Sequence, residues 1–190
     1  MGQHWTATSI ESHLRSVASS GEQSATAFIV GGGAMVLHGF RERAPDLDII
    51  VDSVDCLHTI DHGFTEAGFT RSIETTIERN SAYMRILHED TFQEIELLTD
   101  DVDLDHRLTD GVRDRSESFV SGEYIDFKVI SQEDLIVSKL LTERQKDLSD
   151  FRSILKTDLY TAVIRSELVT QCALQDRDVP STLFLGGFGK

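Results

Sequence analysis

FIVGGGAMVLHG at residues 28–39 and RAPDLDIIVD at residues 43–52 decide the fold of this chain. The first stretch is an apolar run that stops at three glycines and continues as a helix-like segment. It predicts a buried strand over 26–31 and a short helix over 33–39. The second stretch alternates and then becomes apolar, which predicts another strand over 46–52. A strand, a glycine turn, a helix and a second strand therefore follow one another closely.

Asp46 and Asp48 stand two residues apart at the start of the second predicted strand. Side chains at this spacing point to the same face, about 6.6 Å apart along the strand. Two such carboxylates repel each other unless a cation lies between them, and Mg²⁺ prefers oxygen ligands and keeps substrate phosphates in its shell. The pair therefore indicates a metal site. A pair of solvated aspartates at a strand entrance is the alternative.

The glycines at 31–33 stand between the first strand and its helix. Glycines there expose backbone N–H groups beside a helix start, which is typical of a phosphate cradle. A tight turn that needs no Cβ atoms is the alternative. The dinucleotide fingerprint is excluded because Val36 stands where its third glycine is required, and the P-loop is excluded because no Gly-Lys-Ser/Thr follows.

A third carboxylate comes from the predicted strand over 91–98, which carries Glu94 and Glu96 on one face and Ile95 and Leu97 on the other. Glu96 precedes an apolar strand end, as Asp48 does. Carboxylates beside buried residues are costly without a partner, so a metal or another cation is expected nearby. An exposed edge face of the sheet is the alternative.

The remaining pattern completes an α+β fold with a mixed β-sheet core flanked by helices and a helical C-terminal part. Thr8 and Glu11 have capping-box spacing at the start of a helix over 8–20, and Ser53 can cap a helix that ends at Gly68. An antiparallel meander over 70–98 follows, and the charged segment 99–118 is expected to be a loop or a short helix. A final strand covers 124–130.

From Ser131 the sequence is predicted to be helical. Ser131 and Asp134 cap a helix through about Thr142, and two more helices follow over about 145–156 and 158–175. We expect a core over 1–130, a helical part over 131–178 packed on it as one compact unit, and an irregular tail over 179–190.

The net charge of the chain argues against some classes of binding partner. It has 190 residues with 18 Lys plus Arg and 33 Asp plus Glu, a formal net charge of −15. This balance argues against broad binding to a nucleic-acid backbone or an anionic membrane surface. No apolar run approaches about 18 residues and no signal peptide is recognisable, so no membrane association is expected. Cys56 and Cys172 form no disulfide framework, which predicts a cytoplasmic location.

Taken together, these motifs resemble the DNA polymerase β-like nucleotidyltransferase superfamily, in its minimal branch and its AbiEii-type toxin relatives. The resemblance covers most of residues 28–155. The matching motifs are the two stretches at 28–39 and 43–52, IELL at 95–98 and EDLIVSKLLTERQKDLSDFRSIL at 133–155. The last stretch is an independent match that contains Lys139, Arg144 and Asp150.

The resemblance implies roles for matching residues. Asp46, Asp48 and Glu96 would be the catalytic carboxylates and would hold Mg²⁺ or Mn²⁺, although active members usually carry an Asp where Glu96 stands. The residues that would bind the nucleotide triphosphate are Gly31, Gly32, Gly33, Arg43, Lys139 and Arg144. Arg43 could also pair with nearby acids, and Lys139 and Arg144 could be solvated positions on an amphipathic helix.

The function implied by the resemblance is transfer of a nucleoside monophosphate from an NTP to an acceptor hydroxyl, with release of pyrophosphate. The acceptor would be a tRNA, a protein or a small molecule. The same resemblance implies a toxin–antitoxin system, with a cognate antitoxin or a second copy of the chain as partner. The alternative is a binding or regulatory module that keeps the fold and has weak or no activity, which the Glu at position 96 would permit.

Overall fold

Seven strands form one mixed sheet in the computed structural model, which describes residues 3–21, 23–77, 82–100, 106–142, 150, 153–155 and 159–179. The strands are β1 (Ala25–Val30), β2 (Asp46–Val51), β3 (Phe69–Ile77), β4 (Ala82–His88), β5 (Glu94–Thr99), β6 (Glu117–Ser121) and β7 (Ile125–Val129). They lie in the order β3-β4-β5-β2-β1-β7-β6. The β2–β5 and β1–β7 pairs are parallel and the other neighbours are antiparallel. The predicted α+β class with a mixed sheet is confirmed.

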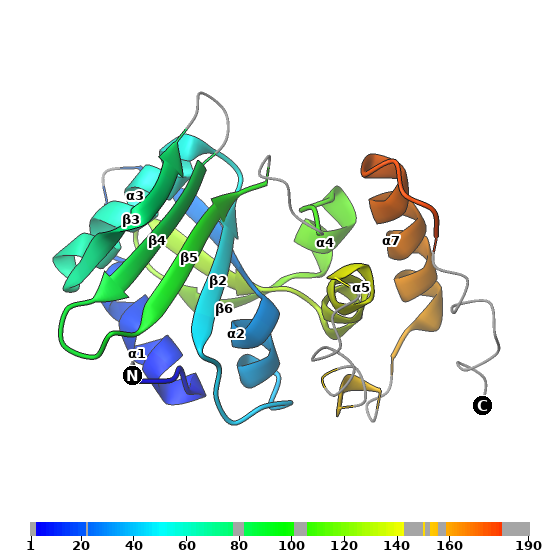
Figure 1. Ribbon diagram of the computed structural model, residues 1–190, viewed down its shortest axis with the longest axis horizontal. Coiled ribbons are helices and arrows are strands. Elements are labelled where there is room, and N and C mark those ends of the chain that lie inside the picture. Colours follow the sequence, from blue (N-terminus) through cyan, green and yellow to red (C-terminus); the bar gives the residue numbers. More distant parts are fainter. Residues whose placement is uncertain are drawn as a thin grey trace.

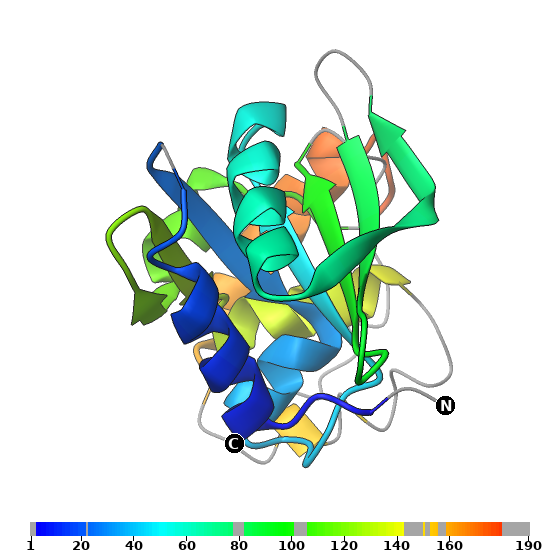
Figure 2. The same ribbon diagram turned by 90° about the vertical axis from the view of Figure 1, so that its left-hand side faces the viewer.

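Two helices, α1 (Ala7–Val17) and α3 (Val54–Glu66), cover one face of the sheet and lie side by side in Figure 2. Phe64 of α3 packs edge-on against Phe69 and Phe127, and all three are buried. These aromatic contacts join α3 to both halves of the sheet. This face therefore forms the main apolar core.

The other described helices are α2 (Gly31–Leu37), α4 (Asp110–Arg115), α5 (Gln132–Thr142) and α7 (Thr161–Leu174). Figure 1 shows α4, α5 and α7 grouped at one end of the molecule, away from β3 and β4. An ion-pair network joins these three helices. Arg115 of α4 contacts the carboxylates of Asp134 and Glu167 at 2.6 Å each, and Thr109 donates to Glu167 at 2.8 Å. The Asp134 side chain is fully buried.

One expectation about local structure is wrong, one is incomplete, and two concern segments mostly or wholly outside the described residues. The capping box of α1 is formed by Thr6 and Ser9 rather than by Thr8 and Glu11, because the helix begins at Ala7. The segment 99–118 was expected to be a loop or short helix, yet it also contains the start of β6. Most residues of β6 are exposed, so its sequence lacks the alternation of apolar and polar residues that indicates a strand. The predicted helix over 145–156 lies mostly outside the described residues, as does the tail from 180.

The predicted caps of α3 and α5 are confirmed. Ser53 accepts a hydrogen bond from the Cys56 backbone at 3.2 Å, and Ser131 accepts one from the Asp134 backbone at 3.1 Å. The division of the chain near residue 130 stays a prediction. No described helix is both long enough and apolar enough to cross a membrane.

Candidate active site

The register of the sheet brings the predicted carboxylates together. In the parallel pair β2–β5, Asp46 lies opposite Glu94 and Asp48 lies opposite Glu96. Neighbouring strands are about 4.8 Å apart, so these four residues form two adjacent rows on the same side of the sheet. We call this set, Asp46, Asp48, Glu94 and Glu96, the carboxylate face. It lies on the side of the sheet opposite the buried Leu47, Ile49, Ile95 and Leu97.

The three glycines meet the carboxylate face at the start of α2. Gly31 has a φ of +56°, and a Cβ atom there would lie 2.2 Å from Asp48 Oδ2. A side chain at residue 31 would therefore clash with Asp48 and strain the backbone. The Gly32 backbone N–H hydrogen-bonds to Asp48. Gly33 faces the apolar core instead of the carboxylate face, because a Cβ atom there would lie 2.4 Å from Leu47 Cδ1.

Asp48 is the most perturbed acid of the carboxylate face. Its residue keeps part of its surface accessible, but protein atoms crowd its carboxyl group and desolvate the charge. This burial, followed by repulsion from Asp46 and Glu96, raises the pKa of Asp48 to about 7. The charge of Lys139 and the Gly32 N–H act in the opposite direction without cancelling the effect. Asp48 thus lies where an added cation would be strongly favoured.

Glu96 is held from the β4 side of the sheet. The Tyr83 hydroxyl donates a hydrogen bond to Glu96 Oε1 at 3.1 Å. Burial raises the pKa of Glu96, and the charges of Asp46 and Glu94 add to that effect, whereas Tyr83 and the charge of Arg85 oppose it. Arg85 itself forms an ion pair with Glu94. The side chain that was expected to need a cationic partner is therefore fixed by a neutral hydroxyl.

Lys139 lies near this site in a buried ion-pair cluster. Its side chain is 11% exposed, and its Nζ atom lies 3.3 Å from Asp150 Oδ2. Arg41, in the segment between α2 and β2, donates from Nε to Asp150 Oδ1 at 2.8 Å. The interpretation of Lys139 as a solvated helix position is therefore wrong, because its side chain is largely buried and its ammonium group is paired with Asp150. Its charge acts on Asp48.

The other predicted cations are placed differently. Arg43 is exposed on the segment that leads into β2, and Arg144 lies outside the described residues. Sequence reasoning missed Arg41 and gave Asp150 no role. The charged sequence from Lys139 to Asp150 could have indicated both residues. Asp150 ends this stretch beside apolar residues, and a carboxylate in such a place needs a cation from elsewhere in the chain.

The donor set of the site fits a hard divalent cation. Among the described residues, no three or more His, Cys, Asp or Glu side chains are already arranged to hold a metal ion. Mg²⁺ is commonly bound by one or two carboxylates with substrate phosphates as further ligands, so the pair Asp46 and Asp48 is sufficient. The raised pKa of Asp48 agrees with such a site, since a cation would remove the repulsion that causes part of it. Glu96 as a third ligand stays a prediction.

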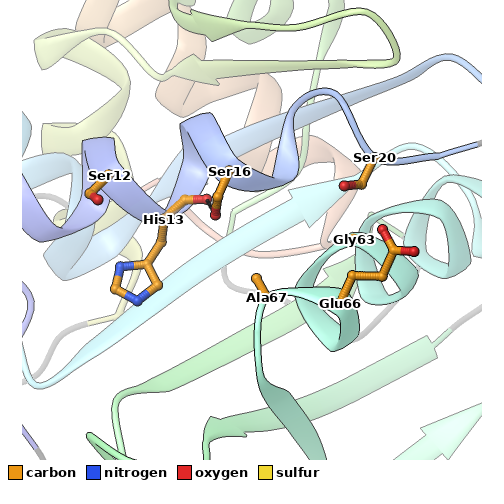
Figure 3. Close-up of a pocket in the computed structure, with 7 residues that line it drawn as sticks. All are labelled: Ser12, His13, Ser16, Ser20, Gly63, Glu66 and Ala67. Carbon is orange, nitrogen blue, oxygen red and sulfur yellow. Dashed lines mark hydrogen bonds between the residues drawn. The ribbon is translucent and has the colours of Figure 1, made fainter.

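Three pockets lined only by described residues lie elsewhere. One lies between α1 and α3, where His13, Ser16 and Glu66 are among the lining residues (Figure 3). These helices cover the side of the sheet opposite the carboxylate face, so this pocket belongs to a different surface. A second lies between α4 and α7, where Arg115 is already paired with Asp134 and Glu167. None of these three pockets is lined by a predicted site residue.

The sequence matches one family of known proteins, and two solved structures are similar to the chain. Residues 8–179 match the family described as "Nucleotidyltransferase of unknown function (DUF6036)". The solved structure of JHP933 from Helicobacter pylori is 14% identical, with a TM-score of 0.48, over 92% of this chain and 84% of its own. A second H. pylori structure, of a candidate nucleotidyltransferase, is 15% identical, with a TM-score of 0.49, over 94% of this chain and 90% of its own. No curated protein matches the chain at a significant level.

Proposed function

The chain belongs to the nucleotidyltransferase family DUF6036, and on that premise we propose that it transfers a nucleoside monophosphate from an NTP to an acceptor hydroxyl in a reaction that depends on Mg²⁺ or Mn²⁺. The observation that carries the proposal is the raised pKa of Asp48, which has the glycine turn on one side and two further carboxylates around it. A purely structural pair of acids would gain nothing from this mutual repulsion. A site that receives a metal ion gains affinity for that cation from the repulsion, and the bound cation can then accept the triphosphate.

The proposed reaction is an in-line displacement at the α-phosphorus. The acceptor oxygen forms a new bond to that phosphorus, the bond to the β-phosphate bridging oxygen breaks, and pyrophosphate leaves with the electron pair. When bound, Mg²⁺ or Mn²⁺ would neutralise phosphate charge in such a displacement. The proton of the acceptor hydroxyl passes to a carboxylate of the site, and we assign that role to Glu96. A base with a raised pKa suits this task.

The other residues of the proposed site bind and orient. Asp46 and Asp48 would hold the metal ion. Gly31 and Gly32 would bind the triphosphate, since they lack side chains and lie against Asp48 and Asp46. Lys139 contributes positive charge from α5, where Asp150 fixes its ammonium group. Arg43 and Arg144 stay predicted contacts of the nucleotide. The NTP is the substrate class that the family implies, and the acceptor is proposed to be a tRNA, a protein or a small molecule.

A non-catalytic binding module is the second candidate. The observation that favours it is the Glu at position 96 together with the lack of a preformed three-carboxylate cluster among the described residues. In a toxin–antitoxin system, which only the sequence resemblance supports, such a module would bind its cognate partner without turning over NTP. Recovery of one defined partner protein, with neither nucleotide binding nor transfer, would favour this candidate.

The experiment that tests the enzyme is incubation of the chain with each α-labelled NTP, Mg²⁺ or Mn²⁺, and a cell extract. Transfer of label to one acceptor, lost in Asp48→Asn, supports the proposal. Asp114→Asn is a matched control because Asp114 is an exposed acid on α4. NTP with Mg²⁺ should also raise the melting temperature of the wild-type protein and of Asp114→Asn, but not that of Asp48→Asn. An absence of both labelling and stabilisation would contradict the proposal.

A further inference from the structure

The strand geometry alone does not fix where the carboxylate of Glu96 lies. A Glu side chain has one more rotatable bond than an Asp and loses more conformational entropy when it is fixed. Displacement of a reacting group by about 1 Å can lower a rate about a hundredfold. A carboxylate on a longer side chain, placed among other acids, therefore needs a contact that limits where it goes.

Tyr83 makes that contact from the neighbouring strand. In the antiparallel pair β4–β5, Tyr83 lies opposite Leu98 and therefore diagonal to Glu96. Diagonal neighbours are about 7–8 Å apart, within reach of an aromatic side chain. The hydroxyl bridges this separation and donates to Glu96 Oε1 at 3.1 Å. Both residues are half-buried, so the bond is partly protected from water.

The chemistry of the donor matters as much as its place. Arg85 lies directly opposite Glu96 in the register, yet it forms an ion pair with Glu94, the other glutamate of β5. A guanidinium bound to Glu96 would neutralise its charge, and a charge-assisted pair is about twice as strong as a neutral hydrogen bond. A phenol hydroxyl fixes the carboxylate and leaves its negative charge in place. This division of partners on β4 gives Glu96 a neutral hydrogen-bond donor, while Arg85 acts on it through its charge.

We propose that Tyr83 is a positioning residue, whose hydroxyl fixes Glu96 Oε1 on the β4 side of the carboxylate face and so sets how far this side chain reaches toward Asp48. The inference rests on the proposed function, because it assigns Tyr83 a part in nucleotidyl transfer through Glu96. Tyr83 itself touches neither the nucleotide nor the acceptor in this proposal.

The first test reads the Glu96 carboxyl group directly and needs no activity. The protein is labelled with ¹³C at glutamate carboxyl carbons, and the Glu96 signal is identified by its loss in Glu96→Gln. Tyr83→Phe removes only the hydroxyl and should shift the Glu96 signal at fixed pH. Tyr124→Phe is the control, since Tyr124 is also half-buried but lies in the β6–β7 turn, and it should leave the Glu96 signal unchanged. An unmoved Glu96 signal in Tyr83→Phe overturns the inference.

The second test measures transfer of labelled nucleotide to the acceptor found for the wild-type protein. Tyr83→Phe should lower kcat about tenfold and leave the KM for NTP within about twofold, because the contact acts on the reacting geometry rather than on nucleotide binding. In a Glu96→Gln background the same change should have no further effect. An unchanged kcat, or an equal loss in both backgrounds, overturns the positioning role.

The two tests separate the inference from the function on which it rests. A wild-type protein that labels no acceptor overturns the proposed function and, with it, any part of Tyr83 in transfer. An active wild-type protein whose Glu96 signal and kcat are both unaffected by Tyr83→Phe overturns the inference alone.

Discussion

The carboxylate face and the ion-pair network around Arg115 both hold acidic side chains against the protein interior, but their charges are balanced differently. In the network, Arg115 contacts both Asp134 and Glu167 at 2.6 Å. Burial there raises the pKa of Asp134 despite its hydrogen bonds with Arg115 and Ser131. The hydrogen bonds from Arg115, Thr109 and Gln171 outweigh burial at Glu167 and hold its pKa below its ordinary value. In the carboxylate face, burial and neighbouring acids raise the pKa of Asp48 to about 7.

This difference separates a structural site from a candidate functional one. Both acids of the network contact the Arg115 guanidinium, so they join helices α4, α5 and α7 with a cation that the chain itself supplies. Acids that repel one another cost stability in the isolated chain, and such a cost is typical of sites that bind a charged ligand. The predictions below test the two halves of this comparison, beginning with the largest expected effect.

Replacing Arg115 by Met should be the most destabilising of these changes. It leaves Asp134, whose side chain is fully buried, and Glu167, whose side chain is 6% exposed, as neighbouring carboxylates without their cation. Removing one partner of a buried ion pair costs about 3–5 kcal/mol of unfolding free energy. Urea denaturation measures this loss.

The matched control for Arg115→Met is Arg15→Met, which breaks the exposed i,i+4 pair with Glu11. That pair should contribute less than about 0.5 kcal/mol. Equal losses in the two variants would show that the network is not the structural element described here.

Replacing Asp48 by Asn should increase the free energy of unfolding, whereas Arg115→Met should decrease it. Well below pH 3.8 the carboxyl group is protonated in both the folded and the unfolded chain, and its contribution to stability is fully present. As the pH rises from 3.8 towards 7, the unfolded chain ionises first, so the wild-type protein loses stability. Asn cannot ionise. The variant should therefore be more stable than the wild type by about 1–3 kcal/mol at pH 8 and nearly equal at pH 4.

Urea denaturation at both pH values checks this prediction, with Asp114→Asn as the exposed control. A wild-type protein and an Asp48→Asn variant with the same pH dependence of stability would remove the basis for the comparison.

Shortening Glu96 to Asp should lower the rate of transfer at least about tenfold, about 1.4 kcal/mol of barrier. The change removes one methylene and so withdraws the carboxylate from the Tyr83 hydroxyl, 3.1 Å away. Single-turnover measurement of labelled transfer gives the rate, and Glu117→Asp, an exposed position on β6, serves as control. A faster Glu96→Asp variant would indicate that position 96 has drifted from a working Asp, as the binding-module candidate requires.

The smallest expected effect is on metal binding. Because a ligand must be deprotonated, Mn²⁺ should bind the NTP-loaded wild-type protein about tenfold more weakly at pH 6 than at pH 8, when the pKa of Asp48 is about 7. Calorimetry at the two pH values measures the ratio. Asp48→Asn should bind weakly at both. A wild-type affinity that does not change with pH would mean that Asp48 is not a ligand.

Local periodicity in the sequence predicted much of the secondary structure. The alternation around Asp46 and Asp48 predicted their shared face, and Ser53 and Ser131 predicted two helix starts that the structure confirms. The glycines were expected to form a turn before a helix over 33–39, whereas α2 begins at Gly31 and the glycines form its first turn. These features depend on residues within a few positions of one another, so the sequence contains what decides them. The strand β6 was not predicted because its exposed edge residues carry little apolar alternation.

The meeting of distant segments depended on tertiary structure. Asp48 and Glu96 are opposite each other because β5 returns to pair in parallel with β2, a register that no local pattern specifies. Lys139, Asp150 and Arg41 come from three separate segments and meet in one ion-pair cluster only in the folded chain. The sequence alone therefore determined which side chains share a face of a strand or begin a helix. Only the packing of the sheet decided which carboxylates repel, which are paired and which hydroxyl holds Glu96, because charge interactions depend on distances across strands and helices far apart in the chain.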